Sequence, residues 1–469
     1  MRFSYRFVSL GKTSSVITVR LSEAFFISIS AFEGKVNEFS AAVDEGQAGV
    51  KGQLTIFALM NYPDISFDNT EFAFEYKSTK DLKKAHFLFS SMAKPWLVKW
   101  GIRLTPWALR NGMPVKGLIR KTIFSQFVGG ETLEQTAQVA RKLGQYNVQV
   151  ILDYGVEGGK ESEEGFEAAT RQFMRVIDHA ATEPNIPFMG IKPSGLARHE
   201  LLEKLDSMMH EIEGTLMKRY LRVMDNLSPE MKDEWQRLTN RLMRIAEHAS
   251  KKSVGVLIDA EETWIQDPVD ALTILMMDTF NRERCVVYNT LQLYRHDRLK
   301  FLEDSFEAAR ERGFILGAKL VRGAYMEKER KRAEEKGYPS PIQTDKESTD
   351  RDFNAAVKFC IEHLDRIGLM VASHNEYSNL YAVKLLEEKG LPLQHPHVHW
   401  SQLYGMSDNI TFNLAHAGCS VSKYLPFGPL GDVIPYLMRR AHENSSVSGQ
   451  TGRELVLIKK ELKRRRERR

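Results

Sequence analysis

Two adjacent arginines in residues 424–444, YLPFGPLGDVIPYLMRRAHEN, are the first candidates for chemistry. The segment is typical of a strand end, a Pro/Gly turn and a helix. On that helix four side chains share one stripe at i, i+3, i+4 and i+7: Tyr436, Arg439, Arg440 and Glu443. Two guanidinium groups beside an aromatic ring suit a carboxylate, because each can bind it through two hydrogen bonds. The same stripe would also fit a solvated, charged helix face.

The elements that must position these side chains come earlier in the chain, where short β-rich runs alternate with helical patterns. The runs are residues 148–152, 188–191, 254–258, 286–289, 315–320, 369–372, 397–400 and 420–423. Eight strands alternating with helices favour an α/β fold of the (β/α)8 TIM-barrel type over an open sheet. Active sites of such barrels lie at the C-terminal ends of the strands, so the polar residues there are the next candidates.

Polar side chains lie at or after the ends of nearly all of these runs. They are Asp153, Glu157, Lys192, Asp259, Gln292, Lys319, Arg322, Tyr325, Ser373, His374, Asn375 and Tyr424. Several have an ordinary structural interpretation: Lys192 as a loop lysine, Asp259 as a helix cap and His374 as part of a helix N-terminus. Together they exceed what a purely structural barrel needs, which indicates a functional site.

Several classes of protein are disfavoured. Gly323 in VRGAY is a lone glycine, and the chain has no dinucleotide-binding or phosphate-binding glycine loop, no convincing metal-ligand spacing and no hydrolase triad signature. We therefore expect no metal. The three cysteines are odd in number and widely spaced, which argues against a disulfide scaffold and for a reducing compartment. No apolar run approaches the ~20 residues of a membrane span.

The 469 residues are expected to form one barrel with additions. The predicted parts are an N-terminal extension of unclear role (1–62), a helical segment (63–145), the barrel (146–445) with a helical insertion (197–252), and a C-terminal helix with a basic tail (446–469). Ser228-Pro229 should split the insertion into two helices. Residues 1–22 contain basic residues, Ser and Thr but no acid, which fits a mitochondrial transit peptide or an upstream extension from an early start codon.

The net charge of +5 is concentrated in the tail. The last eleven residues, KKELKRRRERR, carry +6, so the rest of the chain sums to −1. Such a tail is typical of a solvated helix end, and the sharper hypothesis is contact with an anionic membrane surface. We expect no nucleic-acid binding, because no DNA- or RNA-binding motif accompanies the tail.

Taken together, eight segments resemble proline dehydrogenase, the flavoenzyme family that begins proline catabolism. They are FVGGET (127–132), GIKPSGL (190–196), LIDAEET (257–263), LQLY (291–294), KLVRGAYMEKER (319–330), SHN (373–375), LYGM (403–406) and YLPFG…YLMRRAHEN (424–444). They stand in the family's order between residues 67 and 445. The resemblance implies a distorted (β/α)8 barrel of the monofunctional type, which holds FAD non-covalently at the C-terminal ends of the strands.

The resemblance also implies roles for single residues. Arg439, Arg440 and Lys192 would hold the proline carboxylate, and Asp259 and Lys319 would be catalytic. The pyrrolidine ring would be walled by Tyr325, Leu403, Tyr424 and Tyr436, and Glu157 would pair with the first arginine when the site closes. Flavin contacts would come from Ala260, Gln292, Val321, Arg322, Gly323, Ala324, Thr344, Lys346, Ser373, His374 and Glu443. Met326 stands where some members carry Trp, which leaves that stacking contact unassigned.

The implied reaction is oxidation of L-proline to Δ1-pyrroline-5-carboxylate, with a hydride passing from the ring carbon beside nitrogen to the flavin. Asp259 or a water would take the amine proton. A membrane quinone would reoxidise FADH2, with the basic tail as a peripheral anchor, and a separate pyrroline-5-carboxylate dehydrogenase would take the product. This places the protein at the cytoplasmic membrane face of a bacterium, or alternatively at the mitochondrial inner membrane or in the matrix.

Three alternatives stay open. The first is hydroxyproline oxidation, against which the bulk of Tyr424 argues, because it should crowd a ring hydroxyl. The second is a flavin barrel of the folate-reductase type, which a nicotinamide cofactor rather than proline would reduce. The third is a catalytically silent protein that binds proline as a ligand.

Overall fold

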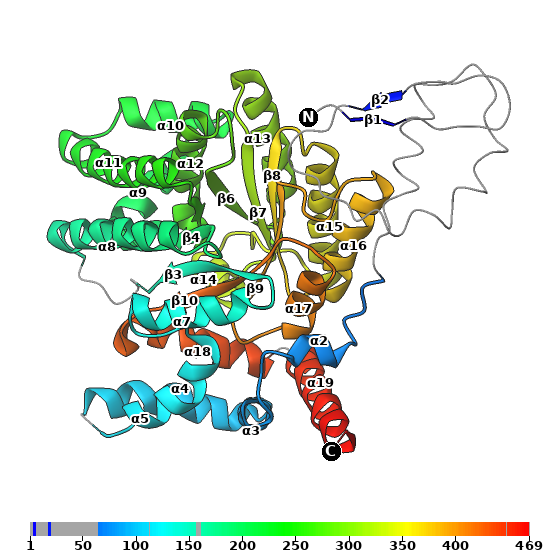
Figure 1. Ribbon diagram of the computed structural model, residues 1–469. Coiled ribbons are helices and arrows are strands. Elements are labelled where there is room, and N and C mark those ends of the chain that lie inside the picture. Colours follow the sequence, from blue (N-terminus) through cyan, green and yellow to red (C-terminus); the bar gives the residue numbers. More distant parts are fainter. Residues whose placement is uncertain are drawn as a thin grey trace, which may run out of the picture. The chain divides into compact units, whose positions relative to one another are not determined.

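Figure 1 shows the fold of the chain as a computed structural model. The structure describes residues 64–111, 113–155, 161–446 and 448–468, and the backbone of two short antiparallel strands, β1 (Phe3–Tyr5) and β2 (Ile17–Val19). The chain divides into two units, Met1–Asn61 and Tyr62–Arg469, and the second carries the barrel. Apart from β1 and β2, the segment that was compared with a transit peptide lies outside the described residues.

Eight parallel strands close into a barrel in the order β10-β3-β4-β5-β6-β7-β8-β9. They are β3 (Val148–Tyr154), β4 (Phe188–Ile191), β5 (Gly255–Ile258), β6 (Val287–Gln292), β7 (Leu316–Val321), β8 (Ile367–Ala372), β9 (Val398–Leu403) and β10 (Val421–Phe427). The predicted (β/α)8 barrel is confirmed, and each strand overlaps a predicted run. The strands are buried on both faces, as parallel strands covered by helices require.

Helices surround the barrel. They are α8 (Glu163–Thr182), α12 (Gln266–Phe280), α13 (Arg298–Arg312), α14 (Met326–Lys336), α15 (Lys346–Glu362), α16 (Glu376–Glu388), α17 (Asp408–His416) and α18 (Leu430–Ser446). Side-chain caps set several starts: Ser162 accepts from the backbone N–H of Gly165 before α8, and Asn375 accepts from that of Ser378 before α16. The second cap fixes the loop that follows β8, which belongs to the candidate site.

The helical insertion lies between β4 and β5 and contains three helices, α9 (His199–His210), α10 (Leu216–Asp225) and α11 (Pro229–Lys252). The predicted break at Ser228-Pro229 is present, and Ser228 caps α11. The stretch before it, expected to be a single helix, is broken between α9 and α10. Gly214 adopts a φ of +124° there, a conformation that glycine tolerates and other residues do not.

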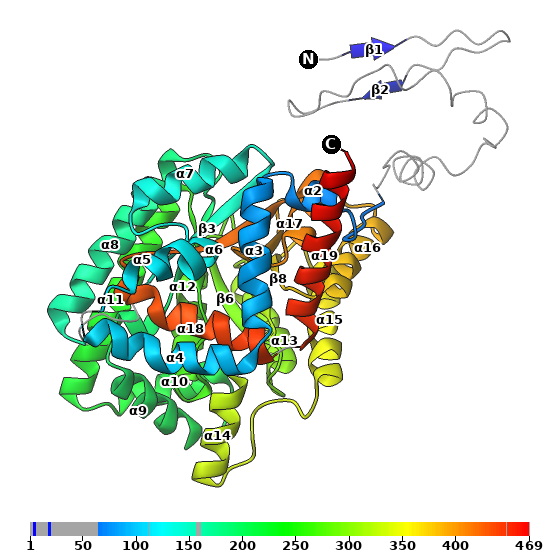
Figure 2. The same ribbon diagram turned by 90° about the horizontal axis from the view of Figure 1, so that it is seen from below.

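Short helices precede the barrel: α2 (Thr70–Phe74), α3 (Thr79–Met92), α4 (Pro95–Arg110), α5 (Lys116–Ile119), the π-helical turn η3 (Arg120–Phe124), α6 (Ser125–Phe127) and α7 (Leu133–Gly144). Figures 1 and 2 both show α4 beside α18, the helix of the arginine pair. A hydrophobic cluster joins them, with Val98 of α4 packed near Val433 and Leu437 of α18. The helix of the arginine pair, α18, is thus packed against the N-terminal helix α4.

The basic tail belongs to helix α19 (Ser448–Glu467), which packs on α2 and α3. Arg465 donates to the backbone carbonyls of Phe74 and Lys77, each at 2.8 Å, and so satisfies the end of α2. Glu461 is fully buried and accepts from the hydroxyl of Thr70 at 2.9 Å. Part of the tail therefore has a structural function, and the expectation of a solvated helix end holds only for its other face.

Among the described residues, the structure has no helix that is both long enough and apolar enough to cross a bilayer.

Candidate active site

Charged side chains from several strand ends meet in the mouth of the barrel. Lys319 of β7 donates to Oδ1 of Asp259, which follows β5, at 2.6 Å, and the hydroxyl of Tyr424 in β10 donates to its Oδ2. Lys192, which follows β4, donates to Oδ1 of Asp153 at 2.8 Å and lies 3.9 Å from Oδ2 of Asp259. The structure thus brings together four predicted site residues, and with them Asp153, a strand-end candidate to which the sequence analysis gave no role.

The charged side chains of this group shift one another's pKa values. Burial would raise the pKa of Asp259, but the ammonium groups of Lys319 and Lys192 outweigh it, so the pKa is lowered and the carboxylate stays ionised. Burial and the negative charges of Asp153 and Asp259 raise the pKa of Tyr424 well above its usual value. Tyr424 therefore keeps its proton and acts as a hydrogen-bond donor.

Tyr424 is also held in place by its surroundings. The ammonium of Lys319 lies 4.9 Å from the centroid of its ring, a cation–π contact. Leu403 pairs with Tyr424 in the sheet register and packs beside it inside the barrel. A Cβ added at Gly190 of β4 would lie 2.6 Å from the Tyr424 hydroxyl oxygen, so the neighbouring strand needs a glycine where the ring points.

The arginine helix α18 contributes Tyr436 and Arg440, which are both buried. Nη2 of Arg440 donates to Oε1 of Glu443 at 2.6 Å, and its guanidinium carbon lies 5.1 Å from the Tyr436 ring centroid. Nε of Arg440 and the hydroxyl of Tyr436 have no hydrogen-bond partner among the described residues. Buried polar groups of this kind are normally bonded, so these two are suited to an incoming polar ligand.

A cavity of about 900 Å³ opens beside this group and is lined by Lys192, Tyr325 and Arg439. The structure thus places three of the predicted substrate residues on one cavity. Glu261 also lines it; burial raises its pKa to about 7, although the Ser194 backbone N–H and hydroxyl donate to it. The sequence analysis gave Glu261 no role. The predicted partner of the first arginine, Glu157, lies outside the described residues.

The predicted flavin residues cluster at the ends of β6, β7 and β8. Arg322, directly after Val321, donates to Asp350 (2.8 Å), Ser373 (2.7 Å) and Ser378 (3.0 Å), which fixes its guanidinium. Gly323 adopts a φ of +134°, and a Cβ there would lie 2.5 Å from the ring of Tyr294. Only glycine fits this turn. Ala324 follows it and is exposed.

The other predicted flavin residues lie on neighbouring loops. Thr344 and Lys346 are at the start of α15, where Thr344 donates to Asp345 at 3.1 Å and Lys346 pairs with Asp350. Ala260 is half-buried beside Asp259. His374 lies 2.9 Å from the Ser407 hydroxyl, and burial lowers its pKa to about 3, with help from nearby positive charges, so its imidazole is neutral. The backbone N–H of Ser407 donates to Glu454 of α19 at 2.5 Å.

Gln292 ends β6 and has a half-satisfied side chain. Its Nε2 donates to the Glu261 carbonyl at 3.0 Å, whereas its Oε1 is buried without a partner among the described residues. An amide oxygen in this state is an acceptor for a ligand N–H.

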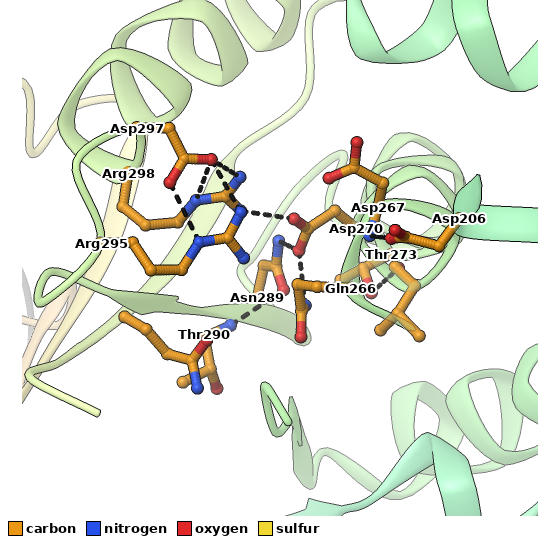
Figure 3. Close-up of polar contacts among 12 residues, drawn as sticks. Asp206, Gln266, Asp267, Asp270, Thr273, Asn289, Thr290, Arg295, Asp297 and Arg298 are labelled. Atoms are coloured by element: carbon orange, nitrogen blue, oxygen red, sulfur yellow. Dashed lines mark hydrogen bonds and ion pairs between the residues drawn. The ribbon is translucent and has the colours of Figure 1, made fainter. Parts of the chain in front are cut away.

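A buried network, which the sequence analysis missed, supports these loops (Figure 3). Asp270 of α12 is fully buried and accepts from Gln266 (2.8 Å), Asn289 (2.9 Å) and Arg298 (2.6 Å). Oε1 of Gln266 accepts in turn from the backbone N–H of Glu261 at 3.1 Å. The network therefore ties α12 to β6 and to the loop after β5, which carries Asp259 and Ala260.

A sequence model described as proline dehydrogenase matches residues 136–453 of the chain. The chain belongs to the proline dehydrogenase family. It is 32% identical over 379 residues to proline dehydrogenase 1, mitochondrial, of Dictyostelium discoideum, covering 75% of this chain and 66% of that protein. It is 34% identical over 424 residues to hydroxyproline dehydrogenase of Mus musculus, covering 84% and 93%. The predicted family and its oxidoreductase class are therefore confirmed.

Among solved structures, proline utilization A (PutA) from Bdellovibrio bacteriovorus matches this family member with a TM-score of 0.60 at 20% identity. The match covers 85% of this chain and 41% of that one, so the chain spans about two fifths of its structural neighbour. At this identity the likeness supports the barrel fold alone.

Proposed function

We propose that the protein oxidises L-proline to Δ1-pyrroline-5-carboxylate with FAD as the bound electron acceptor. The observation that carries this proposal is the arrangement of cations around one cavity: Lys192 and Arg439 line it, and the Asp259–Lys319–Tyr424 group lies beside Lys192. An amino acid with a carboxylate and a small apolar ring fits such a combination of charge and aromatic wall.

Arg439, Arg440 and Lys192 would hold the carboxylate. Lys192 is already bonded to Asp153, and Arg440 to Glu443, so both cations are positioned before the substrate arrives. Arg440 also has a buried Nε donor without a partner among the described residues, and a guanidinium offers five N–H groups in all. Positioned donors cost little reorganisation, which favours tight orientation of the substrate.

Tyr424 would decide between proline and hydroxyproline. Its hydroxyl is bonded to Asp259, and the ammonium of Lys319 lies over its aromatic ring. These contacts hold the side chain in one orientation, so it would not move to make room for the hydroxyl group of hydroxyproline. With Tyr325, Leu403 and Tyr436 it would form an apolar wall around the pyrrolidine ring. Hydroxyproline remains the second candidate, because the mouse relative at 34% identity carries the name hydroxyproline dehydrogenase.

The residues present fit a flavin. The unpaired Oε1 of Gln292 would accept from a ring N–H, and Gly323 lets the backbone approach closely. FAD, when bound, supplies a two-electron acceptor for the hydride that leaves the ring carbon beside nitrogen. Lys319 would place a positive charge beside that acceptor. The remaining contacts would come from Ala260, Val321, Arg322, Ala324, Thr344, Lys346, Ser373, His374 and Glu443.

Asp259 would position other groups rather than take the amine proton. Its lowered pKa makes it a poor base at neutral pH, because proton acceptors work best when their pKa is near the working pH. Its two oxygens instead hold Lys319 and Tyr424. A water would then accept the proton that the amine must lose before its lone pair can assist hydride departure.

The electrons would pass to a membrane quinone, and a separate pyrroline-5-carboxylate dehydrogenase would consume the product. The reduced cofactor must pass two electrons to an acceptor before the next turnover, and the resemblance to the family makes a quinone the expected one. It places the protein at a membrane face, either the cytoplasmic side of a bacterial inner membrane or the mitochondrial inner membrane.

An anaerobic absorption spectrum tests the proposal. L-proline should bleach the visible band of the FAD-loaded protein, and an Arg439→Met, Arg440→Met double variant that still binds FAD should stay yellow. Bleaching by hydroxyproline alone would promote the second candidate, and bleaching by a nicotinamide cofactor alone would indicate a different flavin enzyme. A protein that takes up no FAD would contradict the proposal.

A further inference from the structure

Helix α4 has an apolar stripe that the described part of the protein leaves uncovered. Its exposed side chains are Trp96 (61%), Leu97 (37%), Trp100 (58%), Leu104 (47%) and Trp107 (53%). At about 100° per residue, these five fall within roughly 100° of arc, so they form one continuous face. Large exposed apolar patches mark interaction surfaces, and tryptophan is rarely left this exposed without one.

The stripe is separate from the face that α4 uses for packing. Val98 is buried on the other side, and it joins the cluster that includes Val433 and Leu437 of α18. Helix α4 therefore has two apolar faces, and the described protein covers one of them. The uncovered face has no packing function among the residues that the structure describes.

The charged residues in the sequence around the stripe have one sign. Between Asp81 and Glu131 the chain has nine Lys and Arg residues and no Asp or Glu. Those on or near α4 that are exposed are Lys94, Lys99, Arg103, Lys116 and Lys121, and Arg120, which is paired with Glu131. Lys99 and Arg103 flank the tryptophans on the helix surface by their spacing. This segment carries +9 in a chain whose net charge is +5, so positive charge is not confined to the tail as the sequence analysis expected.

Tryptophan and leucine combined with flanking Lys and Arg match the composition of helices that lie in the surface of an anionic bilayer. The indole rings sit at the level of the lipid headgroups, and the cations bind phosphates. A second copy of this chain, docked face to face, would instead bring positive charges against each other and cost binding energy.

We propose that α4 docks the protein on an anionic lipid surface, with Trp96, Trp100 and Trp107 inserted among the headgroups. This assigns membrane contact to α4 instead of the basic tail, where Arg464, Arg465 and Arg468 are bonded to groups of the protein itself. Since α4 packs directly on α18, docking brings the arginine helix close to the lipid (Figures 1 and 2). Electron delivery to a membrane quinone by this route rests on the proposed function; the docking does not.

Vesicle co-sedimentation of the full chain tests the docking. The protein should bind vesicles of phosphatidylcholine and phosphatidylglycerol in equal parts, bind phosphatidylcholine alone far more weakly, and dissociate as salt is raised. A Trp96→Ser, Trp100→Ser, Trp107→Ser variant should bind at least about tenfold more weakly. Its thermal unfolding should match the wild type, because the three side chains are exposed, and its proline oxidation with a water-soluble acceptor should be unchanged.

The matched control changes exposed cations of the tail: Lys459→Gln, Lys463→Gln and Arg466→Gln. This variant should keep its vesicle binding, and a loss in it alone would overturn the assignment to α4. Full binding by the tryptophan variant would do the same. Self-association through the stripe without vesicle binding would identify a second copy as the occupant and refute docking on lipid. Proline oxidation without vesicle binding contradicts the docking only, and vesicle binding without proline oxidation contradicts the proposed function only.

Discussion

Replacing Lys319 with Met tests whether this lysine keeps Asp259 ionised. Lys319 is 6% exposed and donates to Asp259 at 2.6 Å, so its loss leaves a buried carboxylate with Tyr424 and, at 3.9 Å, Lys192. Leaving one member of a buried ion pair uncompensated costs about 3–5 kcal/mol. The remaining partners reduce that cost, so we expect a loss of about 2–3 kcal/mol in the free energy of unfolding at pH 8.

The loss should depend on pH with a definite sign. In the wild type the pKa of Asp259 is lowered, so its contribution to stability is present above the ordinary carboxyl pKa and disappears as the pH falls through the lowered value. In the variant burial dominates and raises the pKa. The variant therefore loses stability as the pH rises, by up to about 1.4 kcal/mol per pH unit, until Asp259 ionises. The deficit should be smaller at pH 5 than at pH 8, because Asp259 of the variant stays protonated further into this range than it does in the unfolded chain.

Urea unfolding at pH 5, 6, 7 and 8 measures this deficit for the wild type, Lys319→Met and an Asp259→Asn, Lys319→Met double variant. The double variant carries neither charge, so its deficit should not vary with pH. A single-variant deficit that is equal at every pH would refute the reasoning. So would the same pH slope in the double variant, because Asp259 could not then be its source.

Two further predictions concern the surroundings of the site. Gly190→Ala should push Tyr424 off Asp259, because the new Cβ would lie 2.6 Å from its hydroxyl oxygen; we expect a loss of about 1–3 kcal/mol in stability and a raised KM for proline in steady-state kinetics. Glu454→Gln should be more stable than the wild type, and the difference should grow as the pH rises. The wild-type Glu454 has a pKa raised to about 7 by burial, so the wild type loses stability between the ordinary carboxyl pKa and that value. The variant should gain up to about 3 kcal/mol relative to it in urea unfolding between pH 4.5 and 8.

Each of these has a contrary outcome. An unchanged KM in Gly190→Ala would show that Tyr424 tolerates displacement and does not define the substrate wall. For Glu454→Gln, the amide oxygen can still accept from the Ser407 N–H, so the hydrogen bond is retained. A stability difference from wild type that does not change with pH would mean that Glu454 is not the titrating group.

The barrel could be predicted because its strands are buried on both faces and therefore appear as apolar, β-branched runs at regular intervals. The candidate site could be predicted because polar groups in such a barrel collect at one end of the strands. Lys192 and Asp259 follow this rule, whereas Lys319 and Tyr424 lie within β7 and β10, because β10 continues to Phe427 beyond its predicted end. Their pairing could not be predicted, since which lysine meets which carboxylate depends on strand register and side-chain length in three dimensions.

Asp270 shows a second limit. It lies in the middle of the apolar run of α12, although an aspartate is seldom fully buried unless it is paired. Its partners Asn289 and Arg298 are 19 and 28 residues away in the sequence. Only the fold brings them together. The break between α9 and α10 was missed for a local reason, because a single glycine at position 214 gives a weak signal against strongly helical flanks.

The arginines of α19 have a consequence for how the protein is made. Arg465 completes the hydrogen bonding of α2, and Glu461 receives the hydroxyl of Thr70, a residue 391 positions earlier. The ribosome synthesises α2 long before α19. During synthesis the carbonyls at the end of α2 therefore lack their Arg465 partner, and the apolar side of the first helices stays exposed. Contacts between segments so distant in the sequence slow folding and prolong the exposure of aggregation-prone apolar surface. Removal of α19 should therefore harm the yield of folded protein before it affects catalysis.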